Sequence, residues 1–563
     1  MPTLNWIGKD KVVTHHQDVP FRVLDKKYTF GDTPDSGNMI IHGDNLEALK
    51  ALLPEYEGRI KCIYIDPPYN TGNEGWVYND NVSDPRIRKW LGQVVGSEVD
   101  DLTRHDKWLC MMYPRLKLLH RLLAEDGIIF ISIDDNEESN LKCICNEIFG
   151  ASNFVSRIIW HNNKKGRQMD KYIKTTCEYV LVYAKKKDNL RLNEKTIGVK
   201  TDSYEYSDEI SRYKKGYPLH NGTAAFHIEN RPNLCYSIYY NPQTKDIRTI
   251  DEKVGERGNY RLELSSEGNE LLSIGYVRIV PKRNEKYNTQ RVWRWGQEKV
   301  NRESSELMFT EEEAGWYIYQ KERMTDDGTK TVKFTNYFDV DTSRGRNTMN
   351  EMFGNVTVFD FPKPTELIEY LFSMVSSADI VLDSFAGSGT TAHAVLNMNN
   401  QDGAKRKFIL CEMGDYAEAV TAERVKRAIA GYGDSANRTE GTGGSFSFYE
   451  LGETIFDPKT GLLNNDAEVE QIRRYVWYTE THTSYNGNEE RSNPYLLGTH
   501  NCSDYYFYYE PQEETVLDWE FLATIKQRAE QYIIFADRCL LADEELQKHN
   551  IVFKKIPRDI KRQ

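Results

Sequence analysis

The chain has 563 residues, 39% of them hydrophobic and 28% charged, which excludes one compact core and fits a globular protein of three or four domain-sized units. No apolar run reaches the roughly 18 residues that cross a bilayer, and the amino-terminal residues lack a secretory pattern, so we expect a cytoplasmic protein that spans no membrane. The net charge of −13 does not exclude a polyanionic partner, because residues 157–188 hold nine Lys or Arg against three acids and residues 278–302 hold eight against two.

The first third of the chain alternates between two apolar patterns. Short continuous runs predict strands over residues 38–44, 60–66, 127–134 and 178–183, and such runs are typical of strands buried on both faces of a parallel sheet. Between the second and third runs, apolar residues recur at steps of three and four and predict a helix: Leu109, Met112, Leu116, Leu119 and Leu123. Alternating strands and helices predict an α/β fold with a doubly wound, mostly parallel sheet.

The later parts of the chain differ in character. From about residue 190 to 345, frequent turn residues and basic-aromatic pairs predict an inserted unit of mixed or β-rich structure. The alternating pattern then resumes, with strands predicted over 379–383 and 407–412, an Ala-rich helix after Thr391 and a helix over 417–430. We therefore divide the chain into residues 1–155 and 346–435 as two halves of one α/β domain, 156–345 as an insertion and 436–563 as a C-terminal α+β region.

The nine cysteines indicate no metal site. They are scattered, without the C-x-x-C spacing of zinc ligands, and several lie within apolar runs. We therefore expect buried, unreactive thiols and no bound metal.

The motif Asp66-Pro67-Pro68-Tyr69 directly follows a predicted strand, at the edge where open α/β sheets bind ligands. An amine on a nucleic-acid base is a poor nucleophile because its lone pair is delocalised into the ring. A carboxylate and a main-chain carbonyl that accept its two protons favour the tetrahedral geometry in which the lone pair attacks. The Tyr69 ring offers a face for an unstacked base. A plain proline-containing turn has the same sequence, so the motif alone does not decide.

Residues 383–391 form a second group of candidate site residues, which consists of a strand end, a Gly-x-Gly turn and the start of a helix. Gly387 and Gly389 let the backbone approach a small ligand closely, and the helix N-terminus favours a carboxylate. The spacing of a phosphate-binding P-loop is absent. Glu412 ends the next predicted strand, where an acid suits two ribose hydroxyls, although acids at strand ends are also common without a ligand.

The order of these motifs resembles the β-class amino-methyltransferases of DNA, and more closely the methylation subunits of type III restriction-modification systems. The likeness covers roughly residues 35–435. Its supporting stretches, besides the two motifs above, are residues 70–72, 78–80, 106–116, 131–137, 231–234, 293–295 and 361–364, and residues 535–539 and 553–558 are similar to the tails of such subunits.

This resemblance implies a Rossmann-like, S-adenosylmethionine-dependent methyltransferase that acts on N6 of a flipped-out adenine in duplex DNA. Asp66, Pro67 and Pro68 would hold the target amine, and Tyr69 would stack on the base. The cofactor would contact Asp44 near its adenine, Lys363 at its methionine end, Glu412 at its ribose, and the glycine-loop residues Asp383, Phe385, Gly387, Ser388, Gly389 and Thr390. Asp44 has a second interpretation, because a charged residue before a helix is often a cap.

The resemblance also assigns roles to the four parts. Residues 1–155 would be the catalytic half, 156–345 the target-recognition region, 346–435 the cofactor half and 436–563 a region for dimerisation or partner contact. Cleavage of DNA would need a helicase-nuclease partner, because the sequence shows no Walker motif or nuclease constellation. A homodimer is compatible with the resemblance.

Several alternatives stay open. Cytosine-N4 methylation is one, although relatives with that activity more often carry Ser than Asp at the first motif position. Others are methylation of RNA or of a protein glutamine, which the basic-aromatic insertion disfavours, and a DNA-specificity subunit for a partner nuclease. An insert around residues 81–105 is interpreted equally well as a lid over the DNA or as a passive surface loop. The recognition sequence does not follow from these residues.

Overall fold

The computed structural model describes residues 3–33, 36–71, 102–166, 172–198, 201–223, 225–325, 328–354, 356–376, 378–434, 438–457, 459–483, 485 and 493–560. Residues 78–80 and most of the insert around 81–105 lie outside this part, so neither interpretation of the insert is tested. The chain divides into two compact units, residues 1–193 together with 334–563, and residues 194–333.

The first unit is built on a ten-stranded sheet with the order β1-β23-β2-β22-β21-β3-β4-β6-β5-β20. The bounds of these strands are β1 Arg22–Gly31, β2 Met39–His42, β3 Ile60–Ile65, β4 Leu123–Ile133, β5 Phe154–His161, β6 Cys177–Ala184, β20 Tyr337–Asp339, β21 Ile380–Asp383, β22 Lys407–Glu412 and β23 Ser445–Thr454. Within this sheet β1 and β6 run opposite to the other strands. The predicted α/β fold with a mostly parallel sheet is confirmed.

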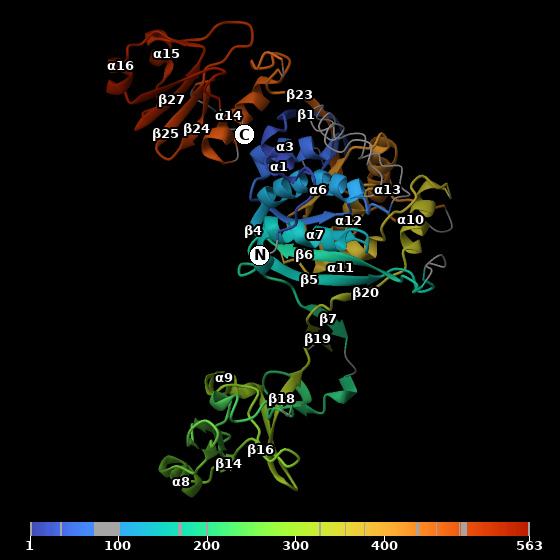
Figure 1. Ribbon diagram of the computed structural model, residues 1–563, viewed down its shortest axis with the longest axis vertical. Coiled ribbons are helices and arrows are strands. Elements are labelled where there is room, and N and C mark those ends of the chain that lie inside the picture. The colour runs from blue at the N-terminus through green and yellow to red at the C-terminus, as the bar shows by residue number, and fades with distance from the viewer. Residues whose placement is uncertain are drawn as a thin grey trace. The chain divides into compact units, whose positions relative to one another are not determined.

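Helices cover both faces of the sheet (Figure 1). Successive strand residues alternate between two cores, as Cys62 and Ile63 of β3 do. One core contains α3 (Asn45–Tyr56), α6 (Leu102–Leu122) and α7 (Glu138–Cys145), and the short helices α1 (Lys9–Val12) and α2 (His15–Asp18) contact α6. The other contains residues of α10 (Ser343–Phe353), α11 (Thr365–Ser373), α12 (Thr390–Asp402) and α13 (Glu423–Ala430), with a π-helical turn over Ala417–Ala422 before α13.

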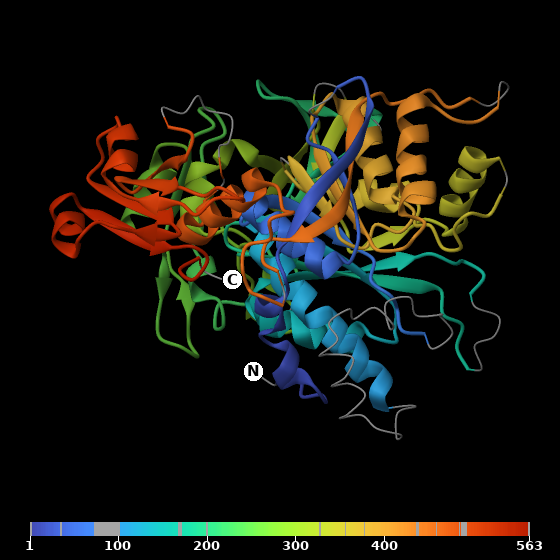
Figure 2. The same ribbon diagram turned by 90° about the horizontal axis from the view of Figure 1, so that it is seen from above.

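The edge formed by β1 and β23 joins distant parts of the chain. The two strands pair antiparallel from Arg22↔Thr454 to Gly31↔Ser445, and Figure 2 shows them side by side, β1 in blue and β23 in orange. Strand β23 therefore belongs to the central sheet, although the sequence division placed it in the C-terminal region 436–563. The β-rich insertion is also shorter than the predicted range 156–345, because β5, β6 and β20 are strands of the same sheet.

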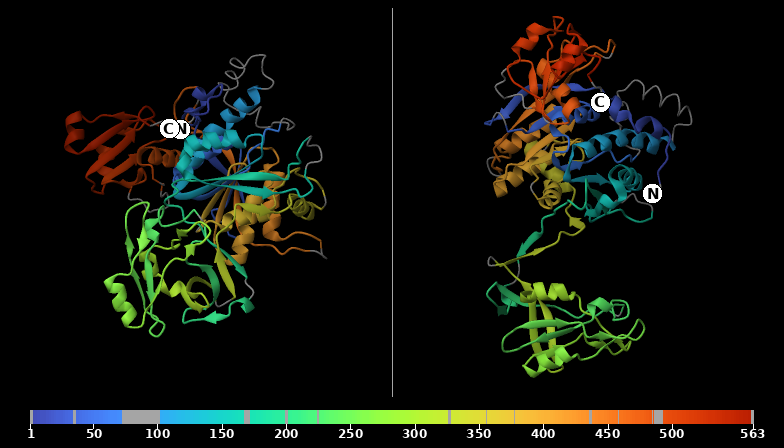
Figure 3. Two further views of the ribbon diagram at one scale, coloured as in Figure 1. Left: turned by 60° about the horizontal axis from the view of Figure 1, so that its bottom comes forward. Right: turned by 90° about the vertical axis from the view of Figure 1, so that its left-hand side faces the viewer.

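In the described residues of the unit 194–333, short sheets are accompanied by the α-helices α8 and α9 and by short 3-10 turns (Figure 3). Strands β7 and β19 pair antiparallel at its two ends, so the chain enters and leaves the unit through one two-stranded ribbon. A core of Leu219, Tyr236, Ile238, Trp293 and Ile318 holds the larger sheets together. The bounds are β7 Lys195–Gly198, β8 Tyr206–Ser207, β9 Arg212–Pro218, β10 Ser237–Tyr240, β11 Ile247–Ile250, β12 Lys253–Val254, β13 Arg261–Leu262, α8 Ser266–Ser273, β14 Val277–Ile279, β15 Arg283–Asn284, β16 Thr289–Gln290, α9 Gln297–Arg302, β17 Leu307–Glu312, β18 Gly315–Arg323 and β19 Thr329–Val332.

The C-terminal residues add a smaller α/β layer to the first unit. A four-stranded sheet with the order β24-β25-β27-β29 packs with α14. Phe21, which precedes β1, and Val23 of β1 share a core with Tyr475, Phe507 and Phe535. The bounds are α14 Val469–Thr481, β24 Leu496–His500, β25 Ser503–Phe507, β26 Val516–Leu517, α15 Trp519–Thr524, β27 Gln531–Ala536, β28 Arg538–Cys539, α16 Asp543–Lys548 and β29 Ile551–Lys555.

The structure also describes the cysteines, the groups that could bind a metal, and the apolar character of the helices. The prediction of buried thiols is right for Cys62, Cys110, Cys145, Cys235 and Cys411, and wrong for Cys143 and Cys502, which are exposed on a helix and a turn. Across the described ranges, no three His, Cys, Asp or Glu side chains cluster as metal ligands would. Of the helices in those ranges, none combines the length and apolar character that crossing a membrane requires.

Candidate active site

Five acids gather at the carboxyl edge of the central sheet. Because β2, β22, β21, β3 and β4 are parallel neighbours, the residues at their carboxyl ends lie along one edge. These ends carry Asp44, Glu412, Asp383, Asp66 and Asp134. The topology thus brings the two predicted groups of site residues together, since β3 and β21 pair directly although some 300 residues separate them in the chain.

Asp66 is held by Lys363. The Lys363 Nζ lies 2.9 Å from Asp66 Oδ2 and 3.9 Å from Glu178 Oε2. Burial disfavours the ammonium, but Asp66 and Glu178 outweigh it, and the pKa of Lys363 is raised. The other carboxylate oxygen, Asp66 Oδ1, is buried and accepts no hydrogen bond from the described residues. Lys363 was expected at the methionine end of a cofactor, and its side chain contacts Asp66 of the Asp-Pro-Pro-Tyr motif.

The Tyr69 ring is fixed by Glu178. The phenol donates a 3.0 Å hydrogen bond to Glu178 Oε2, and the Asn162 amide donates to Glu178 Oε1 at 2.7 Å. Burial and the two neighbouring carboxylates, Asp66 and Glu178, raise the pKa of Tyr69 well above its usual range, so the phenol stays a donor. The Lys363 ammonium lies 4.8 Å from the centre of the Tyr69 ring.

The backbone of the motif is held from both sides. The Trp108 indole donates a 2.7 Å hydrogen bond to the Pro68 carbonyl. Asn70, which follows Tyr69, adopts a left-handed conformation with φ 58°. Its amide donates to Glu137, a fully buried carboxylate that also contacts His105 Nδ1 at 2.6 Å. These contacts fix the direction in which Asp66 and Tyr69 point.

The loop after β21 is shaped around Asp383. Its carboxylate accepts the Phe385 N–H at 3.0 Å and the Thr391 hydroxyl at 2.5 Å, and burial raises its pKa to about 7. Gly387 and Gly389 have φ values of 52° and 81°, which side chains adopt only with strain. A Cβ at Gly389 would lie 3.0 Å from the Thr421 carbonyl, so this turn has no room for one.

Glu412 lies beside the same loop. Its Oε2 accepts the Gly387 N–H at 2.7 Å and its Oε1 accepts the Gly414 N–H at 2.8 Å. Burial raises its pKa. The predicted neighbourhood of Glu412 and the glycine loop is therefore observed, with the carboxylate already engaged by backbone amides.

Asp44 is the N-cap of α3. Its Oδ1 accepts the Leu46 N–H at 2.8 Å, and its Oδ2 lies 3.3 Å from Arg115 Nη2. The Asn45 amide beside it donates to the Ser384 carbonyl at 2.9 Å. Of the two interpretations of Asp44, the geometry favours the cap.

The sequence patterns missed four residues that the structure places at the site: Trp108, Glu178, Glu137 and Arg424. Only the direction of its strand could have pointed to Glu178. A strand that runs antiparallel to its neighbours begins where they end, so an acid at its start reaches the same edge as Asp66. Nothing in the pattern of residues 178–183 indicated that direction.

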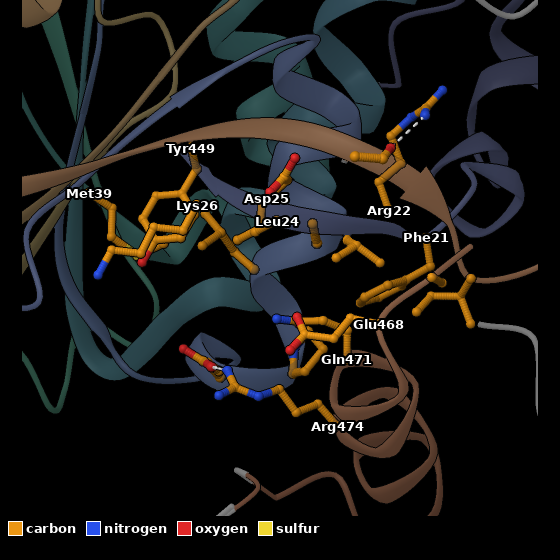
Figure 4. Close-up of a pocket in the computed structure, with 18 of the residues that line it drawn as sticks. Phe21, Arg22, Leu24, Asp25, Lys26, Met39, Tyr449, Glu468, Gln471 and Arg474 are labelled. Carbon is orange, nitrogen blue, oxygen red and sulfur yellow. Dashed lines mark hydrogen bonds and ion pairs between the residues drawn. The ribbon is translucent and has the colours of Figure 1, made fainter. Parts of the chain in front are cut away.

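A cavity of about 810 Å³ lies elsewhere in the first unit, between β1, α3 and α14 (Figure 4). Its two arginines are already paired, since Arg22 lies 2.6 Å from Glu47 and Arg474 contacts Glu55. None of the predicted site residues lines it. The cavity is therefore distinct from the carboxyl edge of the sheet.

The family comparison agrees with the motifs and their geometry. The model described as DNA methylase, for N6 and N4 methyltransferases, matches residues 60–423, which is more than half of the chain. The chain belongs to this family. The match begins with β3, which carries the Asp66 motif, and ends after the glycine loop and Glu412.

This DNA methylase has curated relatives of two kinds. It is 34% identical over 430 residues to the EcoPI Mod subunit of a type III restriction-modification enzyme from Escherichia phage P1, covering 72% of this chain and 62% of the relative. It is 31% identical over 444 residues to the EcoP15I Mod subunit of Escherichia coli, covering 73% and 64%. It is 32% identical over 397 residues to the type II methyltransferase M.KpnI of Klebsiella pneumoniae, covering 69% and 84%. The chain thus spans less than two thirds of these Mod subunits.

Proposed function

We propose that this methylase transfers a methyl group from S-adenosylmethionine to N6 of an adenine flipped out of duplex DNA. The observation that carries the proposal is Asp66 Oδ1, which is buried without a hydrogen-bond donor while Lys363 holds Oδ2. A buried acceptor without a donor costs about 1–3 kcal/mol, and at the carboxyl edge of the sheet this cost would be relieved by a donor that arrives with the substrate. The amine of a base is such a donor.

The surrounding residues suit that amine. Since Trp108 already donates to the Pro68 carbonyl, we assign the second acceptor to the carbonyl of Pro67. When two acceptors receive hydrogen bonds from both N–H groups of the amine, the nitrogen lone pair is directed away from the base plane. Glu178 holds the Tyr69 ring in one orientation, which supports stacking of the base. After transfer, Asp66 is the group placed to take the proton that the methylated amine releases.

The loop after β21 fits the cofactor. Gly387 and Gly389 have no side chains, so a ligand can approach the backbone of their turn closely. A Cβ at Gly387 would lie 3.3 Å from the Phe359 ring, which is a tight contact. Bound S-adenosylmethionine supplies an electrophilic methyl group. The residues that would hold it are Asp383, Phe385, Gly387, Ser388, Gly389, Thr390 and Glu412.

The test is transfer of tritiated methyl groups to duplex DNA, followed by nucleoside analysis. We expect labelled N6-methyladenine from the wild-type protein and none from Asp66→Asn, which removes one acceptor and keeps the side-chain shape. Cofactor binding by the variant, measured by equilibrium dialysis, should be unchanged. Labelled N4-methylcytosine in place of N6-methyladenine would overturn the choice of base, and full activity of the variant would overturn the catalytic centre.

We further propose that the unit of residues 194–333 reads the DNA. Cations lie over aromatic rings there, as Arg294 does over Tyr217 at 5.9 Å and Lys286 over Tyr287 at 5.3 Å, and both tyrosines are more than half exposed. Such pairs suit phosphates and bases. In Arg294→Gln and Lys286→Gln, each lost phosphate contact should lower the slope of log affinity against log salt by roughly 1. Unchanged slopes would contradict this assignment.

The likeness to Mod subunits supports two proposals about partners, a helicase-nuclease restriction chain and a second copy of this chain. Copurification from a host that expresses both chains tests the first. Light scattering of the purified methylase tests the second, and a monomer that methylates DNA fully would contradict it.

A further inference from the structure

Arg424, near the start of α13, is a fully buried guanidinium without a carboxylate partner among the described residues. Its Nη1 donates to Ser388 Oγ at 2.8 Å and to Thr390 Oγ1 at 2.6 Å. Its Nε and Nη2 are buried and contact no acceptor. Burial lowers the pKa of Arg424 to about 10, so the group stays charged near neutral pH.

No neighbouring charge balances this guanidinium. Glu423, its neighbour on α13, lies 2.7 Å from Arg427. The acids of the glycine loop are engaged by other donors, Glu412 by the amides of Gly387 and Gly414 and Asp383 by Phe385 and Thr391. His393 lies nearby, and burial lowers its pKa to about 3, so it is neutral. A buried cation without a counter-charge is costly, which indicates that an anion completes the arrangement.

The position of the guanidinium identifies where this anion belongs. Ser388 and Thr390, to which it donates, lie at the N-terminus of α12, a helix of 13 residues. The helix N-terminus and the guanidinium place positive potential at the same turn. A hydroxyl that accepts a hydrogen bond from a cation becomes a stronger donor. Thr390 also donates to the Lys363 carbonyl at 3.2 Å, which ties this turn to the residue that holds Asp66.

We propose that Arg424 is the counter-charge for the carboxylate on the methionine portion of S-adenosylmethionine, acting through the Ser388 hydroxyl and the N-terminus of α12. This inference rests on the proposed function, because it assumes that cofactor. Arg424 is then a positioning residue: it orients the Ser388 hydroxyl toward the ligand and supplies the positive potential that selects a ligand with a carboxylate.

The test compares two ligands that differ in that carboxylate, S-adenosylmethionine and its decarboxylated analogue, by equilibrium dialysis without DNA. We expect the wild-type protein to bind S-adenosylmethionine roughly 10-fold to 100-fold more tightly than the analogue. Arg424→Met should lose most of this preference while its affinity for the analogue changes by less than about threefold. Arg424→Lys, which keeps the charge, should retain part of the preference.

The matched control is Arg427→Met, one turn further along α13, where the arginine pairs with Glu423 and contacts the Met352 carbonyl. It should keep the wild-type preference. Because both ligands titrate the same folded molecules, the ratio of their affinities is independent of any loss of folded protein. If Arg424→Met weakens both ligands equally, Arg424 only shapes the loop and the inference is wrong. If the wild-type protein binds neither ligand, the proposed function itself fails.

Discussion

The contact between Lys363 and Asp66 allows a decisive experiment, because the sequence and the structure assign Lys363 to different places. The resemblance puts it at the methionine end of the cofactor, whereas its Nζ lies 2.9 Å from Asp66 Oδ2, the proposed catalytic carboxylate. The perturbation is Lys363→Met, which keeps most of the side-chain volume and removes the charge. The control is Lys426→Met, because the Lys426 ammonium lies over the ring of Tyr28, which belongs to the edge strand β1.

The size of the effect follows from the geometry. At an effective dielectric constant of about 20, charges 2.9 Å apart attract by roughly 6 kcal/mol, and most of this is offset by desolvation. Removing one partner of a buried pair costs about 3–5 kcal/mol. The side chains of Lys363 and Asp66 are 13% and 24% exposed, so we reduce this to about 2–3 kcal/mol. If that energy orients Asp66 for transfer, kcat falls roughly 30-fold to 150-fold.

The assay is steady-state methyl transfer at saturating duplex DNA, with kcat and the KM for the cofactor measured separately. We expect a lower kcat and a KM within about threefold of the wild-type value, because the side chain acts on Asp66. A normal kcat with a raised KM for the cofactor would refute this reasoning and restore Lys363 to the methionine end.

Three further outcomes are expected. Trp108→Phe removes the hydrogen bond from the indole to the Pro68 carbonyl, which is worth about 1–1.5 kcal/mol, so kcat/KM should fall roughly tenfold. Cofactor binding, measured by dialysis, should be unchanged. An unchanged kcat/KM would show that the indole does not position the motif. The pKa of Asp383 is raised to about 7, so the folded protein keeps a proton that the unfolded chain loses near pH 4, and stability falls by up to about 4 kcal/mol as the pH rises from about 4 to 7. Urea unfolding without cofactor should show Asp383→Asn gaining on the wild type across this range, and a constant difference would show that Asp383 is ionised when folded. Glu252 is 3% exposed and accepts hydrogen bonds from Ser237, Tyr239, Ser265 and Arg278, so Glu252→Ala should destabilise the unit of residues 194–333 by about 3–5 kcal/mol. Calorimetry should show that this unit melts at a lower temperature, and gel-shift assays should show a loss of DNA binding while cofactor binding is retained. An unaltered melting profile would argue against this network.

The central strands could be predicted because strands that are buried on both faces have continuous runs of apolar residues in the sequence. Residues 60–66, 379–383 and 407–412 are continuous apolar runs, and these are the strands covered by helices on both faces. The edge strand β1 was not predicted, because four of its ten residues are exposed, among them Asp25, Lys26 and Lys27. Edge strands share the composition of surface loops, so their pattern does not separate them from loops.

The contacts of the site were less predictable than its motifs. The sequence places Asp66 and Asp383 at strand ends, and strand order alone then brings them together. Glu178 reaches the site only because β6 runs antiparallel, and strand direction is a tertiary property that a run of apolar residues does not encode. Asp44 shows the converse problem, because a cap and a ligand-binding acid have the same local sequence.

The ribbon of β7 and β19 has a consequence for how such enzymes diversify. Residues 194–333 leave and rejoin the rest of the chain through two paired strands, and they have a core of their own. Under the proposed division of labour, this unit can be exchanged between homologous genes by two crossovers within the codons of the ribbon. One recombination event would thereby give the enzyme a new methylation pattern, while the residues around Asp66 and Asp383 stay unchanged.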